Sequence, residues 1–175
     1  MLHWYGLFIG LAIAVGWSVA EKIEPKVNKV APWVLGLGLL GARGWHVVDT
    51  WSYYGQNLSQ VVAVWNGGLS IWGGLVGGGV GLLIYHYTIK SLDHLGEMLG
   101  AIVTGLPLAQ AIGRLGNGVN GEFVNKAWIL PWWGAEALLD LGLFWLISRI
   151  GLIRRIWVYL IGYALIRLVL QPYRL

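Results

Sequence analysis

Residues 97–122 read EMLGAIVTGLPLAQAIGRLGNGVNGE, an apolar stretch that ends in polar side chains. Residues 97–116 are long enough to cross a membrane as one helix. Arg114, Asn117, Asn120 and Glu122 then alternate with glycines, which let backbone come close to a ligand. A charged residue near bilayer depth costs about 2.5–3.5 kcal/mol even on a lenient scale, so it is usually kept to line a path, hold an ion or bind a lipid. The stretch therefore predicts a ligand site at the end of a membrane helix.

Arg114 is the residue around which this site is expected to form. Its forked guanidinium suits a pair of phosphate oxygens, and Asn117, Asn120 and Glu122 can bond to hydroxyl groups. The alternative is a structural ion pair between Arg114 and either Glu122 or Glu136. If the helix continues, Arg114, Asn117 and Gly121 share one face, but the glycines make unwinding equally compatible with the sequence.

The composition indicates an all-α polytopic integral membrane protein built as a helical bundle. Of the 175 residues, 57% are hydrophobic and 11% charged, mean hydropathy is +0.66, and there are 12 tryptophans; soluble domains carry nearer about 25% charged residues. We expect one transmembrane domain over residues 1–175, with six membrane helices, or seven. The six predicted spans are 4–20, 31–49, 69–88, 97–116, 131–148 and 156–171.

Lysine and arginine gather in alternate loops, at residues 21–30, 89–96 and 149–155, whereas residues 50–66 contain none. The positive-inside rule places the basic loops in the cytoplasm and residues 50–68 and 117–130 outside. The polar stretch 113–122 then lies near the outer leaflet. We interpret the net charge of +4 as contact between loops and anionic lipid, so no nucleic-acid partner is expected. With no cysteine, thiolate nucleophiles and thiolate metal sites are excluded.

Residues 65–81 are rich in glycine, and Gly73, Gly77 and Gly81 recur at small-xxx-small spacing. This spacing predicts close packing of two helices, although glycines at 73 and 74 also let a lipid approach the backbone. No strand precedes the Gly-x-Gly patterns, so a nucleotide-binding reading is weak.

Other polar side chains lie inside apolar stretches. Arg43 lies within the second span with His46 one turn away, and either binds a ligand or extends toward the outer surface. Glu136 and Asp140 are spaced i and i+4, which suggests internal ion pairing or a general base. Tyr163, Arg167 and Gln171 form a polar stripe on the last span. His3 and Tyr5 either belong to an interfacial belt or turn inward to a ligand.

Three arginines on three predicted helices, Arg43, Arg114 and Arg167, could converge on one anionic group. A cytosolic metabolite would bring that group from the basic side of the membrane, whereas a phospholipid could enter laterally from the outer leaflet, where Arg114 is expected to lie.

Several of these motifs together resemble the prolipoprotein diacylglyceryl transferase family of bacteria, over nearly the whole chain. They are residues 2–6 (LHWYG), 40–43 (LGAR), 65–75 (WNGGLSIWGGL), 113–122 (GRLGNGVNGE) and 161–167 (IGYALIR). Residues 113–122 match the family signature closely.

The resemblance implies transfer of the diacylglyceryl group from phosphatidylglycerol to the lipobox cysteine thiol of a prolipoprotein signal peptide, with release of glycerol phosphate. It implies no metal or soluble cofactor, and a multi-pass location in the bacterial cytoplasmic membrane with the active site toward the outer leaflet. Arg114 and Arg167 correspond to the arginines that hold the phosphate and stabilise the leaving group. Glu122 and Tyr5 complete the expected catalytic set. The expected substrate-binding residues are His3, Arg43, His46, Gly73, Gly74, Asn117, Asn120, Gly121 and Tyr163.

Two features depart from the family pattern. Many members carry a histidine, often discussed as the base, where this chain has Trp72. His46, Tyr5 or Glu122 would then deprotonate the thiol, or the substrate arrives partly as thiolate. The periplasmic head segment usual before the fifth span is also reduced to residues 123–130, as in a minimal member. The alternatives are a catalytically inactive phospholipid-binding protein of the same fold and a small transporter.

Overall fold

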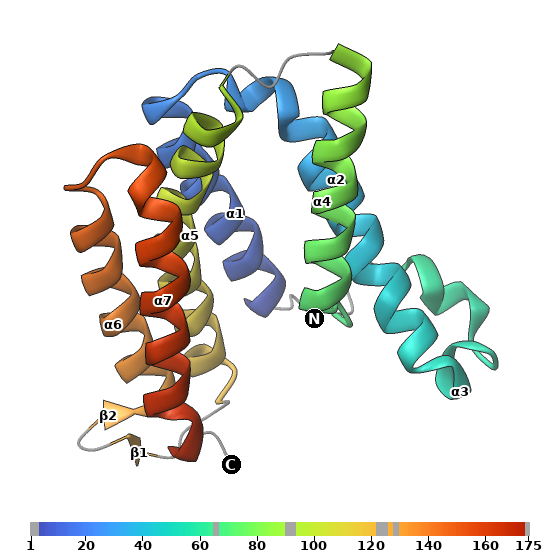
Figure 1. Ribbon diagram of the computed structural model, residues 1–175. Helices are drawn as coiled ribbons and strands as arrows, with labels where there is room; N and C mark the ends of the chain where they lie inside the picture. The colour runs from blue at the N-terminus through green and yellow to red at the C-terminus, as the bar shows by residue number, and fades with distance from the viewer. Residues whose placement is uncertain (1–3, 65–66, 90–93, 122–125, 128–129, 174–175) are drawn as a thin grey trace. The chain divides into compact units, whose positions relative to one another are not determined.

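The computed structural model describes residues 4–64, 67–89, 94–121, 126–127 and 130–173 (Figure 1). Within them the protein is all-α apart from one short pair of strands. The chain forms two compact units, one of Met1–Val27 with His94–Leu175 and one of Asn28–Asp93. We call them unit 1 and unit 2 and describe each by itself. The single transferase domain expected over residues 1–175 stays a prediction.

Unit 1 is a helical bundle with α5 at its centre. It contains α1 (Trp4–Ile23), α5 (Leu95–Val119), α6 (Trp132–Ile147) and α7 (Leu152–Leu170). Helix α5 packs against the other three, and α5, α6 and α7 run side by side in Figure 1. A short antiparallel pair, β1 (Lys126–Ala127) with β2 (Leu130–Pro131), precedes α6, and the 3-10 turn η3 (Gln171–Tyr173) follows α7.

Small residues allow α1 and α5 to approach closely. A Cβ added at Gly105 of α5 would overlap the carbonyl oxygen of Gly16 in α1. Larger apolar side chains fill the contact of α6 with α7, where Leu143, Ile147 and Tyr159 form a buried cluster. In this bundle, glycines therefore mediate the contact of α1 with α5, and larger side chains mediate the contact of α6 with α7.

Unit 2 contains α2 (Val27–Asp49, entering the unit at Asn28), the short helix α3 (Trp51–Tyr54), the 3-10 helix η1 (Leu58–Val62) and α4 (Ile71–Ile89). A Cβ at Gly77 of α4 would overlap the carbonyl oxygen of Leu37 in α2, and added Cβ atoms at Gly73 and Gly81 would overlap α2 carbonyls in the same way. The close helix packing predicted from the glycine spacing is therefore confirmed.

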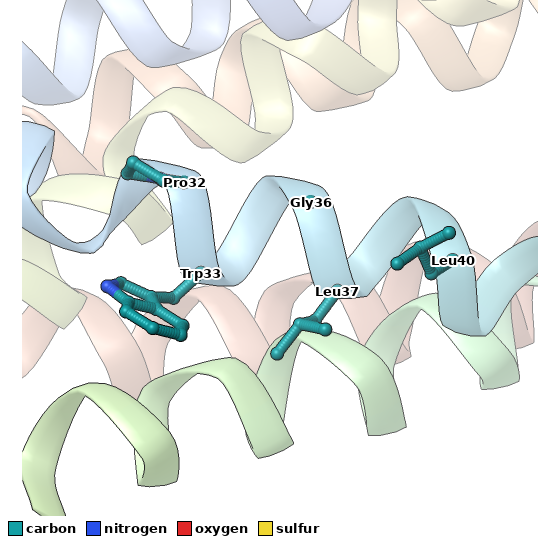
Figure 2. A pocket seen from close by; sticks show the side chains of 5 residues that line it. All are labelled: Pro32, Trp33, Gly36, Leu37 and Leu40. Carbon is teal, nitrogen blue, oxygen red and sulfur yellow. The ribbon is translucent and has the colours of Figure 1, made fainter. Parts of the chain in front are cut away.

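An apolar hollow lies along α2 and is lined by Pro32, Trp33, Gly36, Leu37 and Leu40 (Figure 2). All five lining residues come from one helix, and none carries a charged or hydrogen-bonding side chain apart from the indole of Trp33. This surface offers packing but no group for chemistry.

Each of the six predicted spans forms a helix, with ends that differ by a few residues. The helices α3 and η1 were not predicted. Two of the described helices, Gly6–Ile23 and Leu95–Val119, are long and apolar enough to cross a membrane by length and composition. The number of membrane crossings therefore stays a prediction.

Candidate anion-binding site

The polar end of α5 keeps its helical form through Arg114 and Asn117. The helix ends at Val119, and Gly121 has a φ of +70°, which glycine adopts without strain. Of the two alternatives left by the sequence, helix continuation is therefore correct for Arg114 and Asn117, while Gly121 lies beyond the helix. Because the two side chains lie one turn apart, Nη1 of Arg114 donates to Oδ1 of Asn117 at 3.2 Å.

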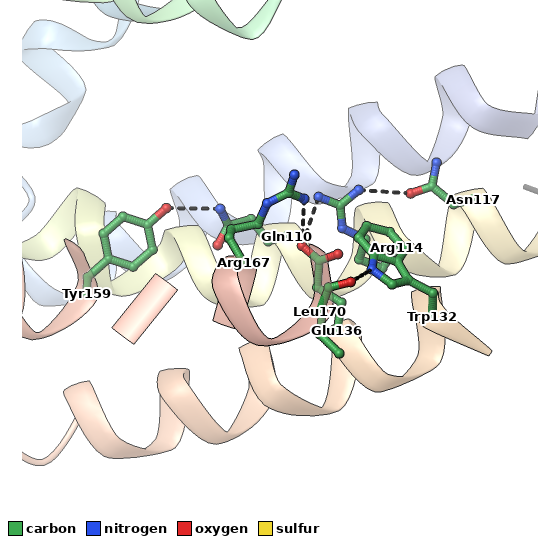
Figure 3. Close-up of polar contacts among 8 residues, drawn as sticks. All are labelled: Gln110, Arg114, Asn117, Trp132, Glu136, Tyr159, Arg167 and Leu170. Atoms are coloured by element: carbon green, nitrogen blue, oxygen red, sulfur yellow. Dashed lines mark hydrogen bonds and ion pairs between the residues drawn. The ribbon is translucent and has the colours of Figure 1, made fainter. Parts of the chain in front are cut away.

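Glu136 of α6 contacts one arginine on each of two neighbouring helices, α5 and α7. This residue of α6 is fully buried, and its Oε1 lies 3.1 Å from Nη2 of Arg114 on α5 and 3.5 Å from Nη1 of Arg167 on α7 (Figure 3). Residues 114, 136 and 167 are distant in sequence and meet only because α5, α6 and α7 pack together. The ion pair of Arg114 with Glu136, one of the two structural alternatives predicted from the sequence, is confirmed.

Trp132, in the first turn of α6, lies under both guanidinium groups. The guanidinium carbon of Arg114 is 5.1 Å from the centre of an indole ring, and that of Arg167 is 5.8 Å from it. These distances suit cation–π attraction. The indole Nε1 of Trp132 donates to the carbonyl of Leu170 at 3.0 Å, which fixes the ring against the end of α7. Arg114, Glu136, Arg167, Trp132 and Asn117 are named here the arginine cluster.

The arginine cluster has spare hydrogen-bonding capacity. Nε of Arg114 and Oε2 of Glu136 are buried and lack a hydrogen-bond partner within the described chain. Both carboxyl oxygens of Asp140, one turn along α6 from Glu136, also lack one there. Unsatisfied buried polar atoms are uncommon in folded proteins and need an explanation. An anionic ligand could accept a hydrogen bond from Nε of Arg114, whereas the carboxyl oxygens would need a donor.

The two arginines are more accessible than the carboxylate between them. The side chains of Arg114 and Arg167 are 18% and 25% exposed, whereas that of Glu136 is 0% exposed. An anion that approaches the cluster therefore meets guanidinium N–H groups first. Preorganised guanidiniums of this kind stabilise phosphate charge strongly in a site that excludes water.

A second polar contact lies deeper in the same bundle. Nε2 of Gln110 on α5 donates to the hydroxyl of Tyr159 on α7 at 2.9 Å (Figure 3). The ring of Tyr159 stacks on that of Tyr163 with centres 5.9 Å apart. Tyr163, predicted to bind substrate, therefore stands one turn from Arg167 and packs against the core of α6 and α7.

Arg43 lies in unit 2, where it contacts η1 and described residues between η1 and α4. Its Nε donates to the carbonyl of Val61 at 2.8 Å. Its other N–H groups donate to backbone carbonyls of four further residues, namely Gln60, Ala63, Gly67 and Gly68. The five contacts match the five donors of a guanidinium. Arg43 therefore holds a loop in place, and its expected role in binding substrate stays a prediction.

The predicted convergence of three arginines is thus seen for two of them within one unit. In unit 2, His46 lies edge-on to Tyr54 with ring centres 5.8 Å apart, and Gly73 and Gly74 belong to the packed face of α4. Tyr5 belongs to α1, and nothing is described of its side chain. His3 and Glu122 lie outside the described residues. Asn120 and Gly121 are exposed just after α5.

Two residues of the cluster were not among the site residues expected from the sequence. The position of Glu136 inside an apolar span signalled an ion pair, but the sequence left Glu122 as an alternative partner. No sequence pattern distinguished Trp132 from the other tryptophans of the chain, which contains 12 in all.

Comparison with known proteins identifies the family of this chain. The sequence pattern of the family described as "Prolipoprotein diacylglyceryl transferase" matches residues 1–175. A phosphatidylglycerol–prolipoprotein diacylglyceryl transferase of Clostridioides difficile is 40% identical over 138 residues, which cover 75% of this chain and 55% of that protein. A protein of the same name from Lactococcus lactis subsp. cremoris is 40% identical over 71% of this chain and 50% of its own length. The chain thus spans about half the length of the curated relatives it matches, and it belongs to the prolipoprotein diacylglyceryl transferase family.

Proposed function

We propose that this protein transfers the diacylglyceryl group of phosphatidylglycerol to the thiol of a lipobox cysteine in a prolipoprotein. The observation that carries the proposal is the meeting of Arg114 and Arg167 at one point in the α5–α6–α7 bundle. Two guanidiniums held by a shared carboxylate and one indole ring form a preorganised receptor for a phosphate group. Membership of the family named for this reaction supports the same substrate.

In this proposal the phosphodiester of the lipid lies against the exposed N–H groups of Arg114 and Arg167. The sulfur attacks the glyceryl carbon, and a carbon–sulfur bond forms as the carbon–oxygen bond to phosphate breaks. Glycerol phosphate leaves with the electron pair of that bond. The charge that develops on the departing oxygen is stabilised by the two guanidiniums, which need little reorganisation because Glu136 and Trp132 already orient them.

The thiol proton has several candidate acceptors. His46, Tyr5 and Glu122 are proposed as alternative bases, and a thiol that arrives as thiolate needs none, because it has already released its proton to water. Holding the sulfur and the glyceryl carbon in contact then supplies much of the acceleration. Trp72, which is 66% exposed on α4, offers no proton acceptor.

We further propose a multi-pass location in the bacterial cytoplasmic membrane, with six spans and the cluster toward the outer leaflet. Large apolar side chains are exposed along α1, α4 and α7, among them Leu11, Leu75 and Leu168. A soluble protein seldom exposes so many large apolar side chains, whereas acyl chains would cover them. The loop charges support the orientation.

Reconstitution tests the proposal directly. The purified chain is incorporated in vesicles of phosphatidylglycerol with a synthetic lipobox peptide, and the peptide mass is followed. The expected result is a gain equal to one diacylglyceryl group on the cysteine. A matched peptide with serine in place of that cysteine should gain nothing. No gain with the cysteine peptide, where a full-length relative works, would refute the transfer.

A second candidate is a phospholipid-binding protein without catalytic activity. The observation that favours it is Trp72, which stands where the family pattern often has histidine. Tight binding of phosphatidylglycerol that depends on Arg114 and Arg167, with no transfer in the assay above, would support this alternative.

A further inference from the structure

The arginine cluster contains one buried carboxylate for two guanidinium groups. Glu136 contacts both Arg114 and Arg167 through the single oxygen Oε1. Asp140 is the neighbouring acid, but its oxygens have no hydrogen-bond partner within the described chain. Within the described residues, the ion pairs of the cluster therefore leave one of the two positive charges unmatched.

The two phosphates of the proposed reaction differ in charge. The phosphodiester of phosphatidylglycerol carries one negative charge. Glycerol phosphate is a phosphate monoester, and its second ionisation near pH 6 gives it about 1.5 to 2 negative charges at neutral pH. Two arginines without a carboxylate would retain the product more strongly than they hold the substrate, because Coulomb attraction grows with each charge.

We propose that Glu136 is a positioning residue that sets the charge preference of this site. It reduces the surplus charge of the two arginines to one, which matches the substrate phosphodiester and weakens retention of the doubly charged product. Its burial behind the more exposed guanidiniums keeps it in place while a phosphate is bound. This inference rests on the proposed function, since it assigns the roles of substrate and product to the two phosphates.

The intact protein provides the first test. Labelled phosphatidylglycerol bound to the chain in detergent at pH 8 is displaced by either glycerophosphoglycerol, a singly charged diester, or glycerol phosphate. We expect the inhibition constant of glycerol phosphate to be no more than about threefold lower than that of the diester, because one unmatched charge attracts the second phosphate charge less than two would. Displacement by glycerol phosphate at concentrations about tenfold lower would overturn the inference. This measurement needs no variant and no catalysis.

The second test removes the carboxylate charge. In Glu136→Gln the ratio of the two inhibition constants should shift about tenfold toward glycerol phosphate, because the site now carries two unmatched charges. A purely structural role for Glu136 would weaken both ligands together and leave this ratio unchanged, which would overturn the inference.

Glu97→Gln is the matched control, because it removes one carboxylate from α5 at an exposed position where it pairs with His94. Its ratio should equal that of the intact chain.

The binding and transfer results separate the two hypotheses. Transfer by the intact chain, with no shift of the ratio in Glu136→Gln, overturns only this inference. A shift of the ratio in Glu136→Gln, with no transfer by the intact chain, supports the role of Glu136 and overturns the proposed function.

Discussion

At the scale of single residues, the proposed phosphate site depends on the geometry of Arg114 and Arg167. Each guanidinium contacts the carboxylate of Glu136 and lies over the indole ring of Trp132. These two contacts fix its orientation. A lysine keeps the charge but lacks the planar fork that bonds a phosphate through two parallel N–H groups. Charge and geometry can therefore be tested apart.

We predict that Arg114→Lys and Arg167→Lys each lower the transfer rate about a hundredfold, since each removes a preorganised donor to the leaving phosphate. Helical content in detergent, measured by circular dichroism, should stay unchanged. Arg149→Lys is the control, because Arg149 is exposed and stacks on Trp145 away from the cluster. A rate near that of the intact chain in either cluster variant would contradict the assignment.

Part of this site could be predicted from residues alone. The cost of Arg114 and Arg167 in an apolar helix marked both as functional candidates, and spacing linked Arg114 to Asn117. The sequence could not choose between Glu122 and Glu136 as the ion-pair partner. That choice depends on how α5, α6 and α7 pack together, and the residues that meet there are far apart in the sequence. It also could not indicate that Arg43 contacts a nearby loop.

At the scale of secondary-structure elements, glycines determine how closely helices approach. Gly77 faces the backbone of Leu37, whereas Gly79 on the same helix has no atom near the position of an added Cβ. The two positions therefore provide a matched pair of substitutions in α4.

We predict that Gly77→Ala lowers the free energy of unfolding by about 1–3 kcal/mol, because the added Cβ would push α4 away from α2. Gly79→Ala should be neutral or slightly stabilising, since alanine costs less entropy in a helix. Thermal unfolding followed by circular dichroism in detergent compares them. Equal loss for both variants would show that the glycine face does not pack as described.

Arg43 binds backbone carbonyls in η1 and in the described residues that follow it. We predict that Arg43→Lys accelerates amide hydrogen exchange in residues 58–64, because a lysine offers three donors in place of five. Arg154→Lys, at an exposed position in α7, should leave exchange there unchanged. Unaltered exchange in Arg43→Lys would mean that the loop holds its form without the guanidinium.

The elements themselves were largely predictable. The lengths of the apolar stretches predicted the positions of all six long helices, and the spacing of the glycines predicted the contact of α2 with α4. The short helices α3 and η1 were missed because residues 50–66 carry no strong periodicity, and the contacts of η1 with Arg43 are made only in the folded chain. The end of α5 was ambiguous because glycine permits both a helix and a turn.

At the scale of the whole molecule, the charges of the loops predict its orientation. A reporter enzyme fused after Asn57 should be active on the outer side of the membrane, and one fused after Gly151 on the cytoplasmic side, since residues 149–155 are basic and 50–66 are not. Reporter activity in intact cells measures this. The opposite result would put the arginine cluster toward the inner leaflet and away from secreted substrates.

The central claim is that the arginine cluster binds a lipid phosphate and releases it as the thioether forms. It is tested most directly by measuring both products together, in vesicles of phosphatidylglycerol that contain the protein and a lipobox peptide. Mass spectrometry reports the diacylglyceryl thioether, and phosphorus NMR reports glycerol phosphate. We predict that the two products appear in equal amounts and at the same rate. Glycerol phosphate without thioether, or neither product, would contradict the account.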